Sequence, residues 1–487
     1  GYHALKTFES DTDGHGSNTA VGSLAMRDAT TGVNNTGIGQ FAMGDGVVTG
    51  DENVAVGMHS MRNVTSTQYS TAVGAKAMGA GVTTGDYNTA VGYNSGNSIT
   101  SGAENILVGS FTGDALTTGL RNVAIGYAAL TTGASNGLNV AIGYEAMKVQ
   151  NAGNTYNVAI GYNAASASTT AEKNTIIGGH AGDAVTSGGF NVAIGYDSLG
   201  SNTVGNSNIA IGSGAMLTNV AADRNVAIGT DALENMTAAS TADHYNVAVG
   251  YHAGNDITSG VENVLIGGLA GDALTTSSYN VAIGHAALGS EDVGVKSTAI
   301  GAYALAAQNV DGDVLNTAVG YFAGSHVTTG THNTLVGGIS GQSLTEGNLN
   351  VAIGYGTLAA ETLGDRSIAI GVNALNAQNN TSDVDAYNVA VGYEAGTLIT
   401  TGVENTITGG HAGDALTTGS YNIAIGTYAL STEDTSSGNI AIGYQALRNQ
   451  DNDANAFNVA VGFDAGKAVT TGRYNTLVGG QTGDALT

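Results

Sequence analysis

Two histidines of this chain stand three residues before an aspartate, in matching phrases. His180 precedes Asp183 and His411 precedes Asp414, both within Gly-Gly-His-Ala-Gly-Asp. An imidazole and a carboxylate could hold a metal ion or an anion if several chains brought their copies to a common axis. Equivalent places elsewhere carry side chains that cannot bind a metal, among them Phe111, Leu269 and Ile339. We therefore keep these four residues as metal candidates and expect no metal site common to all repeats.

An aspartate recurs at the end of the same phrase along the chain. Such carboxylates could bind Ca²⁺ together with backbone carbonyls or a neighbouring carboxylate. The Gly-Gly-x-Gly-x-Asp nonapeptide of calcium-binding β-rolls is absent, however, and Gln342 replaces the aspartate in one copy. We therefore favour a turn-forming role and expect no cofactor. The recurring residues are Asp114, Asp183, Asp272, Asp414 and Asp484.

Tyrosine is the third residue type that could do chemistry. It follows a glycine of the repeat in ten places and precedes the first residue of the repeat in eight. Rows of tyrosine could bind sugars through exposed rings, or they could pack where chains meet. We favour packing and keep sugar binding as the alternative.

The remaining ionisable residues form no catalytic motif. None of the ten histidines lies in a Gly-x-Ser-x-Gly or His-Glu-x-x-His frame, and the acidic residues are dispersed through turn sequences. We therefore expect no catalytic residues and no enzymatic activity.

All of these residues belong to one short repeat. The phrase Asn, β-branched residue, Ala, Val or Ile, Gly occurs 27 times, mostly at steps of 17 residues. A fixed short period is typical of a stacked-coil protein. We predict an all-β fold, a parallel β-solenoid or β-roll of about 27 coils of about 17 residues.

Within the repeat we number the asparagine as position 0 and the glycine as position 4. Alternation places the β-branched positions 1 and 3 on one face of a strand and the small positions 0, 2 and 4 on the other. Positions 0 to 4 hold no charged residue in any of the 27 copies. Both faces are therefore expected to be covered, one inside the coil and one by identical chains in a homotrimer. The sequence leaves open which face lines the interior.

Positions 0 and 4 have structural interpretations. Position 0 is asparagine in 24 copies, and stacked asparagines can form a hydrogen-bonded ladder. Position 4 is glycine in all 27, which indicates a corner that requires positive φ or a close backbone approach. Representative ladder residues are Asn122, Asn139, Asn157, Asn246 and Asn388, and the matching corner glycines are Gly126, Gly143, Gly161, Gly250 and Gly392.

A longer period groups the coils in fours. Residues 1–87 form irregular N-terminal coils, and residues 88–487 form regular four-coil units of about 70 residues. The second coil of each unit has a bulky residue at position 2, such as Leu107, instead of alanine. We expect the enlarged residue to be compensated by a small one nearby.

Composition limits the partners of the chain. Its net charge of −26 argues against binding to nucleic acid, and its apolar runs are too short for insertion of this segment into a membrane. The absence of cysteine excludes disulfides. The absence of proline fits a backbone whose amides bond to neighbouring coils.

The phrase Asn-[Thr/Val]-Ala-[Val/Ile]-Gly-x-x-Ala resembles the head repeats of YadA-like trimeric autotransporter adhesins. The longer unit, with Asp-Ala-Leu-Thr-Thr-Gly, is similar to repeats of phage tail fibres and other surface fibres. The resemblance implies a homotrimer of left-handed parallel β-rolls. The coil here is longer than the adhesin unit.

We therefore expect a non-enzymatic structural and adhesive fibre segment, an adhesin head or a tail-fibre shaft. It is expected outside the cell, on a cell surface or a virion, with a host-cell or matrix receptor such as a glycan. Because the chain starts and stops within a repeat, we expect anchor and tip domains to lie beyond it. Two alternatives stay open, an ice- or surface-binding β-solenoid and a polysaccharide-degrading tailspike-like β-helix.

Overall fold

The structure is a computed structural model that describes residues 1–8, 16–238 and 241–486. Its secondary structure consists of 27 three-residue strands, and the described residues contain no helix. The chain forms two compact units, Gly1–Tyr245 and Asn246–Thr487. Each strand coincides with positions 1 to 3 of one repeat.

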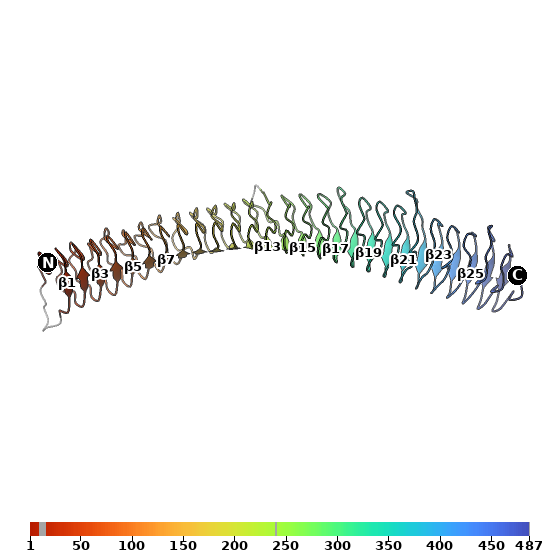
Figure 1. The fold of residues 1–487 in the computed structure, drawn as a ribbon, viewed down its shortest axis with the longest axis horizontal. Helices are drawn as coiled ribbons and strands as arrows, with labels where there is room; N and C mark the ends of the chain where they lie inside the picture. The colour runs from red at the N-terminus through yellow and green to blue at the C-terminus, as the bar shows by residue number, and fades with distance from the viewer. Residues whose placement is uncertain (9–15, 239–240, 487) are drawn as a thin grey trace. The chain divides into compact units, whose positions relative to one another are not determined.

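The first unit contains thirteen strands (Figure 1). They are β1 (Thr19–Val21), β2 (Thr36–Ile38), β3 (Val54–Val56), β4 (Thr71–Val73), β5 (Thr89–Val91), β6 (Ile106–Val108), β7 (Val123–Ile125), β8 (Val140–Ile142), β9 (Val158–Ile160), β10 (Thr175–Ile177), β11 (Val192–Ile194), β12 (Ile209–Ile211) and β13 (Val226–Ile228).

The second unit contains the other fourteen strands. They are β14 (Val247–Val249), β15 (Val264–Ile266), β16 (Val281–Ile283), β17 (Thr298–Ile300), β18 (Thr317–Val319), β19 (Thr334–Val336), β20 (Val351–Ile353), β21 (Ile368–Ile370), β22 (Val389–Val391), β23 (Thr406–Thr408), β24 (Ile423–Ile425), β25 (Ile440–Ile442), β26 (Val459–Val461) and β27 (Thr476–Val478).

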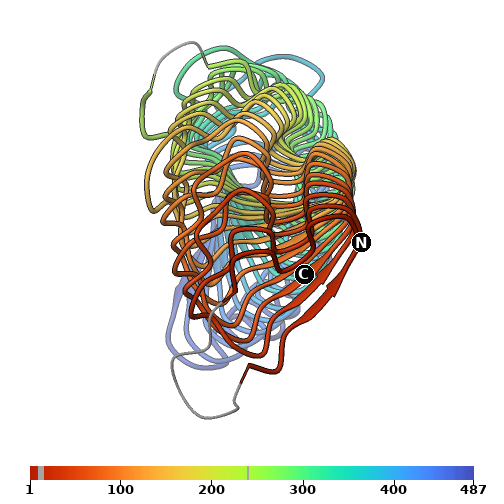
Figure 2. The ribbon, with the colours of Figure 1, turned by 90° about the vertical axis from the view of Figure 1, so that its left-hand side faces the viewer.

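Within each unit, every strand pairs in parallel with the strands that precede and follow it in the chain. The pairing joins equivalent repeat positions, so that Val123 lies beside Val140 and Ile125 beside Ile142. Figure 2 shows the N-terminal coils end on, each one a loop that leaves one strand and comes back beside it at the next strand. The prediction of a parallel β-solenoid of about 27 turns of about 17 residues is confirmed.

The small face of the strand lines the interior of the coil. Ala124 at position 2 is completely buried, as is Asn122 at position 0, whereas Val123 and Ile125 point outward and are partly exposed. The opposite wall is made by position 8, where Leu130 is also completely buried. Because leucine or methionine fills most of a narrow interior, the strand has room only for alanine.

In the second coil of each four-coil unit, the large side chain is on the strand and the small residue is on the opposite wall. Leu107 replaces alanine on the strand, and glycine replaces leucine on the opposite wall. A Cβ on Gly113 would lie 3.0 Å from Leu107 Cδ2, and one on Gly96 would lie 2.8 Å from Leu107 Cδ1. The leucine therefore occupies the space that the two glycines leave free.

Three positions per coil adopt left-handed backbone angles, and most of them hold a residue other than glycine. In the β7 coil they are Arg121 with φ 57°, Ala128 with φ 53° and Leu130 with φ 55°. Such angles cost roughly 1 kcal/mol or more for each residue with a Cβ. The inter-coil hydrogen bonds offset that cost, as where Leu130 N donates to Ala146 O at 3.1 Å.

No helix of the described residues is long and apolar enough to cross a membrane.

Candidate functional site

Aromatic side chains from consecutive coils of the first unit form a continuous row. Neighbouring ring centroids lie 5.2 to 6.1 Å apart. The spacing follows from the distance between parallel strands, about 4.8 Å, because each coil contributes one ring just after its corner glycine. We call this set the aromatic row: Tyr93, Phe111, Tyr127, Tyr144, Tyr162, His180 and Tyr196.

The row changes its geometry at Phe111. Tyr144 is stacked between Tyr127 and Tyr162, with interplanar angles of 14° and 12°. Phe111 instead stands edge-on to Tyr93 and Tyr127, at 84° and 75°. Its ring comes from position 6, one residue later than the tyrosines, because position 5 of this coil is a serine. The interrupted stacking leaves Phe111 without a parallel neighbour.

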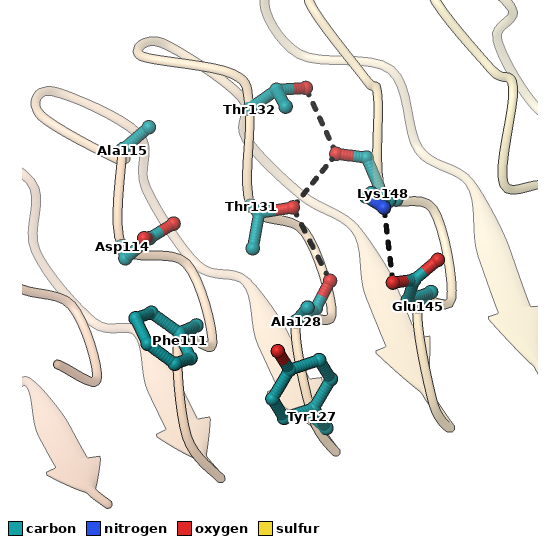
Figure 3. A pocket seen from close by; sticks show the side chains of 9 residues that line it. All are labelled: Phe111, Asp114, Ala115, Tyr127, Ala128, Thr131, Thr132, Glu145 and Lys148. Carbon is teal, nitrogen blue, oxygen red and sulfur yellow. Dashed lines mark hydrogen bonds and ion pairs between the residues drawn. The ribbon is translucent and has the colours of Figure 1, made fainter. Parts of the chain in front are cut away.

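A cavity of about 470 Å³ opens beside Phe111 and extends over the coils of β6, β7 and β8 (Figure 3). The rings of Phe111 and Tyr127 lie at one end of it and the Thr132 hydroxyl at the other, with the Asp114 and Glu145 carboxylates between them. We call it the Phe111 pocket. Its lining residues are Phe111, Asp114, Ala115, Tyr127, Ala128, Thr131, Thr132, Glu145 and Lys148.

The polar groups of the Phe111 pocket are held in place by neighbouring coils. Thr131 Oγ1 and Thr132 Oγ1 both donate to the backbone oxygen of Lys148, at 3.2 and 2.9 Å. Lys148 Nζ forms an ion pair with Glu145 Oε1 at 3.0 Å. Burial raises the pKa of Asp114, and hydrogen bonds from the backbone amides of Ala115 and Asp114 partly oppose that shift. The pocket thus offers fixed donors and acceptors beside an aromatic wall.

The coils of β23, β24 and β25 in the second unit have the same framework, with a large side chain in the place of the pocket. Tyr428 stands where the pocket has Ala128, and its ring stacks on His411 with centroids 5.2 Å apart and planes 3° apart. The guanidinium of Arg448 lies over the Tyr428 ring at 5.4 Å. Of the side-chain differences between the two places, tyrosine for alanine at position 6 is the one that puts a ring where the pocket is open.

The histidine–aspartate pairs are in contact in both units. His180 Nδ1 lies 3.3 Å from Asp183 Oδ2, and His411 Nδ1 lies 3.3 Å from Asp414 Oδ2. His411 Nδ1 is also 3.3 Å from Glu394 Oε2. Across the part of the chain that the structure describes, no group of three or more His, Asp or Glu side chains is arranged to hold a metal ion. Burial raises the pKa of Asp414, and His411 partly opposes that shift.

The position-0 asparagines form a ladder in the interior. Asn122 Nδ2 donates to Asn105 Oδ1 at 2.9 Å and to Asn136 O at 2.8 Å, and Asn122 Oδ1 accepts from Asn139 N at 3.1 Å. All the hydrogen-bonding groups of the amide are used within the protein, so no group remains for a ligand. The same bonds recur at other position-0 residues. The Oδ1 atoms of Asn139, Asn246 and Asn388 each accept a hydrogen bond from the backbone amide of the next position-0 residue. The Nδ2 atoms of Asn157, Asn246 and Asn388 each donate to a turn carbonyl.

The corner glycines form a second ladder. Gly126 has φ 134°, and a Cβ on it would lie 2.2 Å from the carbonyl oxygen of Gly143 in the next coil. Both the backbone angle and the space therefore demand glycine. Positive φ between 140° and 144° and equally close approaches recur at Gly143, Gly161, Gly250 and Gly392.

Three buried glutamates in the second unit were missed from sequence, where acidic residues had been assigned to exposed turns. Glu291, Glu361 and Glu433 are completely buried. Glu433 accepts hydrogen bonds from Ser436 N and Gln450 Nε2, both at 2.8 Å, and burial raises its pKa. A signal was present, since each of these glutamates is followed 17 residues later by a glutamine, at the spacing of one coil.

A second cavity of about 380 Å³ in the first unit is lined by basic side chains, including His59, Arg62 and Lys76. Burial and the nearby Arg62 lower the pKa of His59, so its imidazole is neutral at pH 7. Arg62 is already paired with Asp45. Lys76 is therefore the main positive charge left in this cavity, which makes it a weaker candidate site than the Phe111 pocket.

The outward face of the strands is uncharged and partly exposed along each unit. It consists of positions 1 and 3, and the most exposed isoleucine side chains there keep 36% to 44% of their surface in contact with solvent. The exposed large apolar members, apart from those of the first and last strands, are Ile38, Ile106, Ile125 and Ile228 in the first unit and Ile266, Ile353, Ile368, Ile370 and Ile425 in the second.

In comparisons with known proteins, no protein-family model matches the chain and no curated protein is similar to it. The fold, a parallel β-solenoid, therefore rests on the repeat and on the strand pairing described above.

Proposed function

We propose that the chain is a non-enzymatic structural and adhesive segment of an extracellular fibre, on a cell surface or a virion. Its coils assemble as a homotrimer, and its exposed flank contacts a host-cell or matrix receptor. The observation that carries the proposal is the uncharged, outward face of β-branched residues, which is repeated on every coil.

The outward face is better suited to association than to solvent. Contiguous apolar surfaces on soluble proteins mark interaction sites. Ile125 is 37% exposed, and covering that remainder is worth about 1 kcal/mol. Equivalent residues recur on successive coils, so even a fraction of this gain summed over a unit exceeds the usual cost of association, roughly 4–15 kcal/mol.

A second copy of the same chain is the occupant that fits this face. Its strands have the same spacing and its positions 1 and 3 are equally uncharged, so the two faces match coil by coil. A partner with scattered charges would leave some of them desolvated and unpaired. The number of three chains and the left-handed coil come from the resemblance to YadA-like adhesin heads and to tail fibres.

Mass measurement in solution tests the assembly. Light scattering coupled to size-exclusion chromatography should give three times the mass of one chain at micromolar concentration. A monomer that stays soluble at high concentration would refute the homotrimer and remove the main support for the fibre.

The same face supports a second candidate function, an ice- or surface-binding solenoid. Positions 1 and 3 form two regular rows, and position 1 is threonine in ten coils. Thermal hysteresis by the isolated protein would favour this function over adhesion. Release of reducing ends from a polysaccharide panel would instead favour the tailspike-like alternative, since the Phe111 pocket contains the carboxylates of Asp114 and Glu145.

A further inference from the structure

We infer that the Phe111 pocket binds one pyranose ring of a neutral glycan. The inference rests on the proposed adhesive function and names the receptor chemistry of one place on the flank. Four properties of the pocket carry it: its size, its aromatic wall, the balance of its polar groups, and the contrast with the filled site of the second unit.

The pocket has the size of a small-ligand site. Its volume of about 470 Å³ falls in the range of roughly 300–1,000 Å³ that is usual for such sites. It is built from three consecutive coils, so its walls are fixed by the inter-coil hydrogen bonds of the solenoid. A site on such a framework loses little conformational entropy when it binds a ligand.

The aromatic wall suits the C–H face of a sugar. Phe111 has no parallel-stacked neighbour, in contrast to Tyr144, which is stacked on both sides. Tyr127 is 46% exposed and lines the pocket next to it. A pyranose ring packs its axial hydrogens against these aromatic rings. This packing buries the apolar face of the sugar and leaves the sugar hydroxyls free to form hydrogen bonds.

The polar groups suit hydroxyls better than a charged ligand. Asp114 and Glu145 accept hydrogen bonds and Lys148 donates them, so two carboxylates face one ammonium. The net negative charge of these three groups disfavours an anionic ligand, and the cationic comparison compound of the test below measures whether a cation binds in its place. A hydroxyl both donates and accepts, so it pairs with either kind of group. In Figure 3 the Asp114 carboxylate points from the β6 coil towards the Thr131 side of the pocket.

The β23 and β24 coils of the second unit show the same framework with the place occupied by a side chain. There His411 replaces Phe111, and its Nδ1 lies 3.3 Å from Asp414 Oδ2. Tyr428 replaces Ala128. The ring of Tyr428 lies between His411 and Arg448. In the first unit Phe111 cannot hydrogen bond to Asp114, and Ala128 leaves room for a six-membered ring. A bound sugar would take the position that the phenol ring holds in the second unit.

The test uses the full chain and a variant that fills the pocket. Ala128→Tyr copies the residue found at Tyr428, where the same left-handed backbone already carries tyrosine (φ 59°). The matched control is Asn163→Tyr, at position 6 of the β9 coil outside the pocket, where φ is 56°. The probes are the methyl pyranosides of glucose, galactose, mannose and N-acetylglucosamine, with methyl glucuronide and an arginine amide as charged comparisons. Binding is measured by saturation-transfer NMR and by titration.

At least one neutral pyranoside should bind the wild-type chain, with affinity reduced about tenfold or more by Ala128→Tyr and unchanged by Asn163→Tyr. The inference is overturned if no neutral pyranoside binds, if Ala128→Tyr binds as well as wild type, or if only the glucuronide or the arginine amide binds. The mass of each sample separates the two proposals. A trimer that binds no sugar would refute glycan binding at the Phe111 pocket and leave the proposed fibre standing. A monomer would refute the proposed fibre.

Discussion

The backbone amide of Asn139 donates to the side-chain oxygen of Asn122, one coil earlier, at 3.1 Å. Both residues are completely buried, and the same relationship links neighbouring position-0 residues through much of each unit. The side chain of one coil thus fixes the start of the strand in the next. Removing one such side chain should therefore affect its neighbours.

Asn122→Ala should destabilise the first unit by about 3 kcal/mol or more. The change leaves Asn136 O and Asn139 N buried without their partners, and each such group costs roughly 1–3 kcal/mol. Chemical denaturation measures the loss, and hydrogen exchange should show faster exchange of the Asn139 amide. Asn151→Ala, at an exposed asparagine without a left-handed backbone angle, should change stability by less than about 1 kcal/mol. Equal effects of the two substitutions would contradict the ladder.

Gly143→Ala should destabilise the protein by more than about 2 kcal/mol. Its φ of 140° disfavours any Cβ, and the added atom would lie 2.1 Å from Gly161 O. Gly153→Ala is the matched control, because its Cβ would have nothing within 4 Å and its φ is not positive. The thermal unfolding midpoint should fall for the first variant and stay constant or rise slightly for the second. A tolerated Gly143→Ala would show that the corner can relax.

The double substitution Ile125→Glu and Ile142→Glu should prevent assembly without unfolding the chain. Both side chains point outward from neighbouring strands, so a charge is tolerated in the single chain and is buried only in the assembly. Thr132→Glu, in a turn, is the control and should leave assembly intact. Light scattering reports the mass, and circular dichroism reports the fold. If the double variant stayed fully assembled, the chains would have to meet through another surface.

The contribution of Glu433 to stability should increase when the pH is lowered from 7 towards the ordinary glutamate range. Burial raises the pKa of Glu433 above the ordinary value of a glutamate, so the folded protein binds a proton more tightly than the unfolded chain. The folded state therefore gains relative stability as the pH falls through the raised pKa, and loses it as the pH rises. Asp114, Asp272 and Asp414 are shifted in the same direction by the same cause.

Denaturation midpoints measured between pH 7 and pH 4.5 test this dependence. Glu433→Gln removes one of the shifted groups and should flatten the curve, whereas Glu346→Gln, at an exposed glutamate, should leave it unchanged. A wild-type chain whose stability falls steadily over this range would show that its carboxylates are stabilised as anions instead.

The fold was determined almost completely by local sequence. The step of 17 residues gives the size of the coil, and the glycine of position 4 gives its corner, since φ of 134° at Gly126 is accessible to glycine and to little else. The alternation of Val123, Ala124 and Ile125 defines two faces of a strand. These features repeat in every coil, so each repeat by itself predicts the same coil structure.

Tertiary structure decided which face is enclosed and where a site exists. Both faces of the strand lack charge, so polarity alone could not show which face lines the interior. The bulk of Leu130 on the opposite wall leaves room only for the small side chain of Ala124. The buried glutamates and the Phe111 pocket depend on side chains one and two coils apart, whose orientation no single repeat specifies. A repeat sequence encodes its own coil, whereas enclosure and cavities arise from the contacts between walls and between coils.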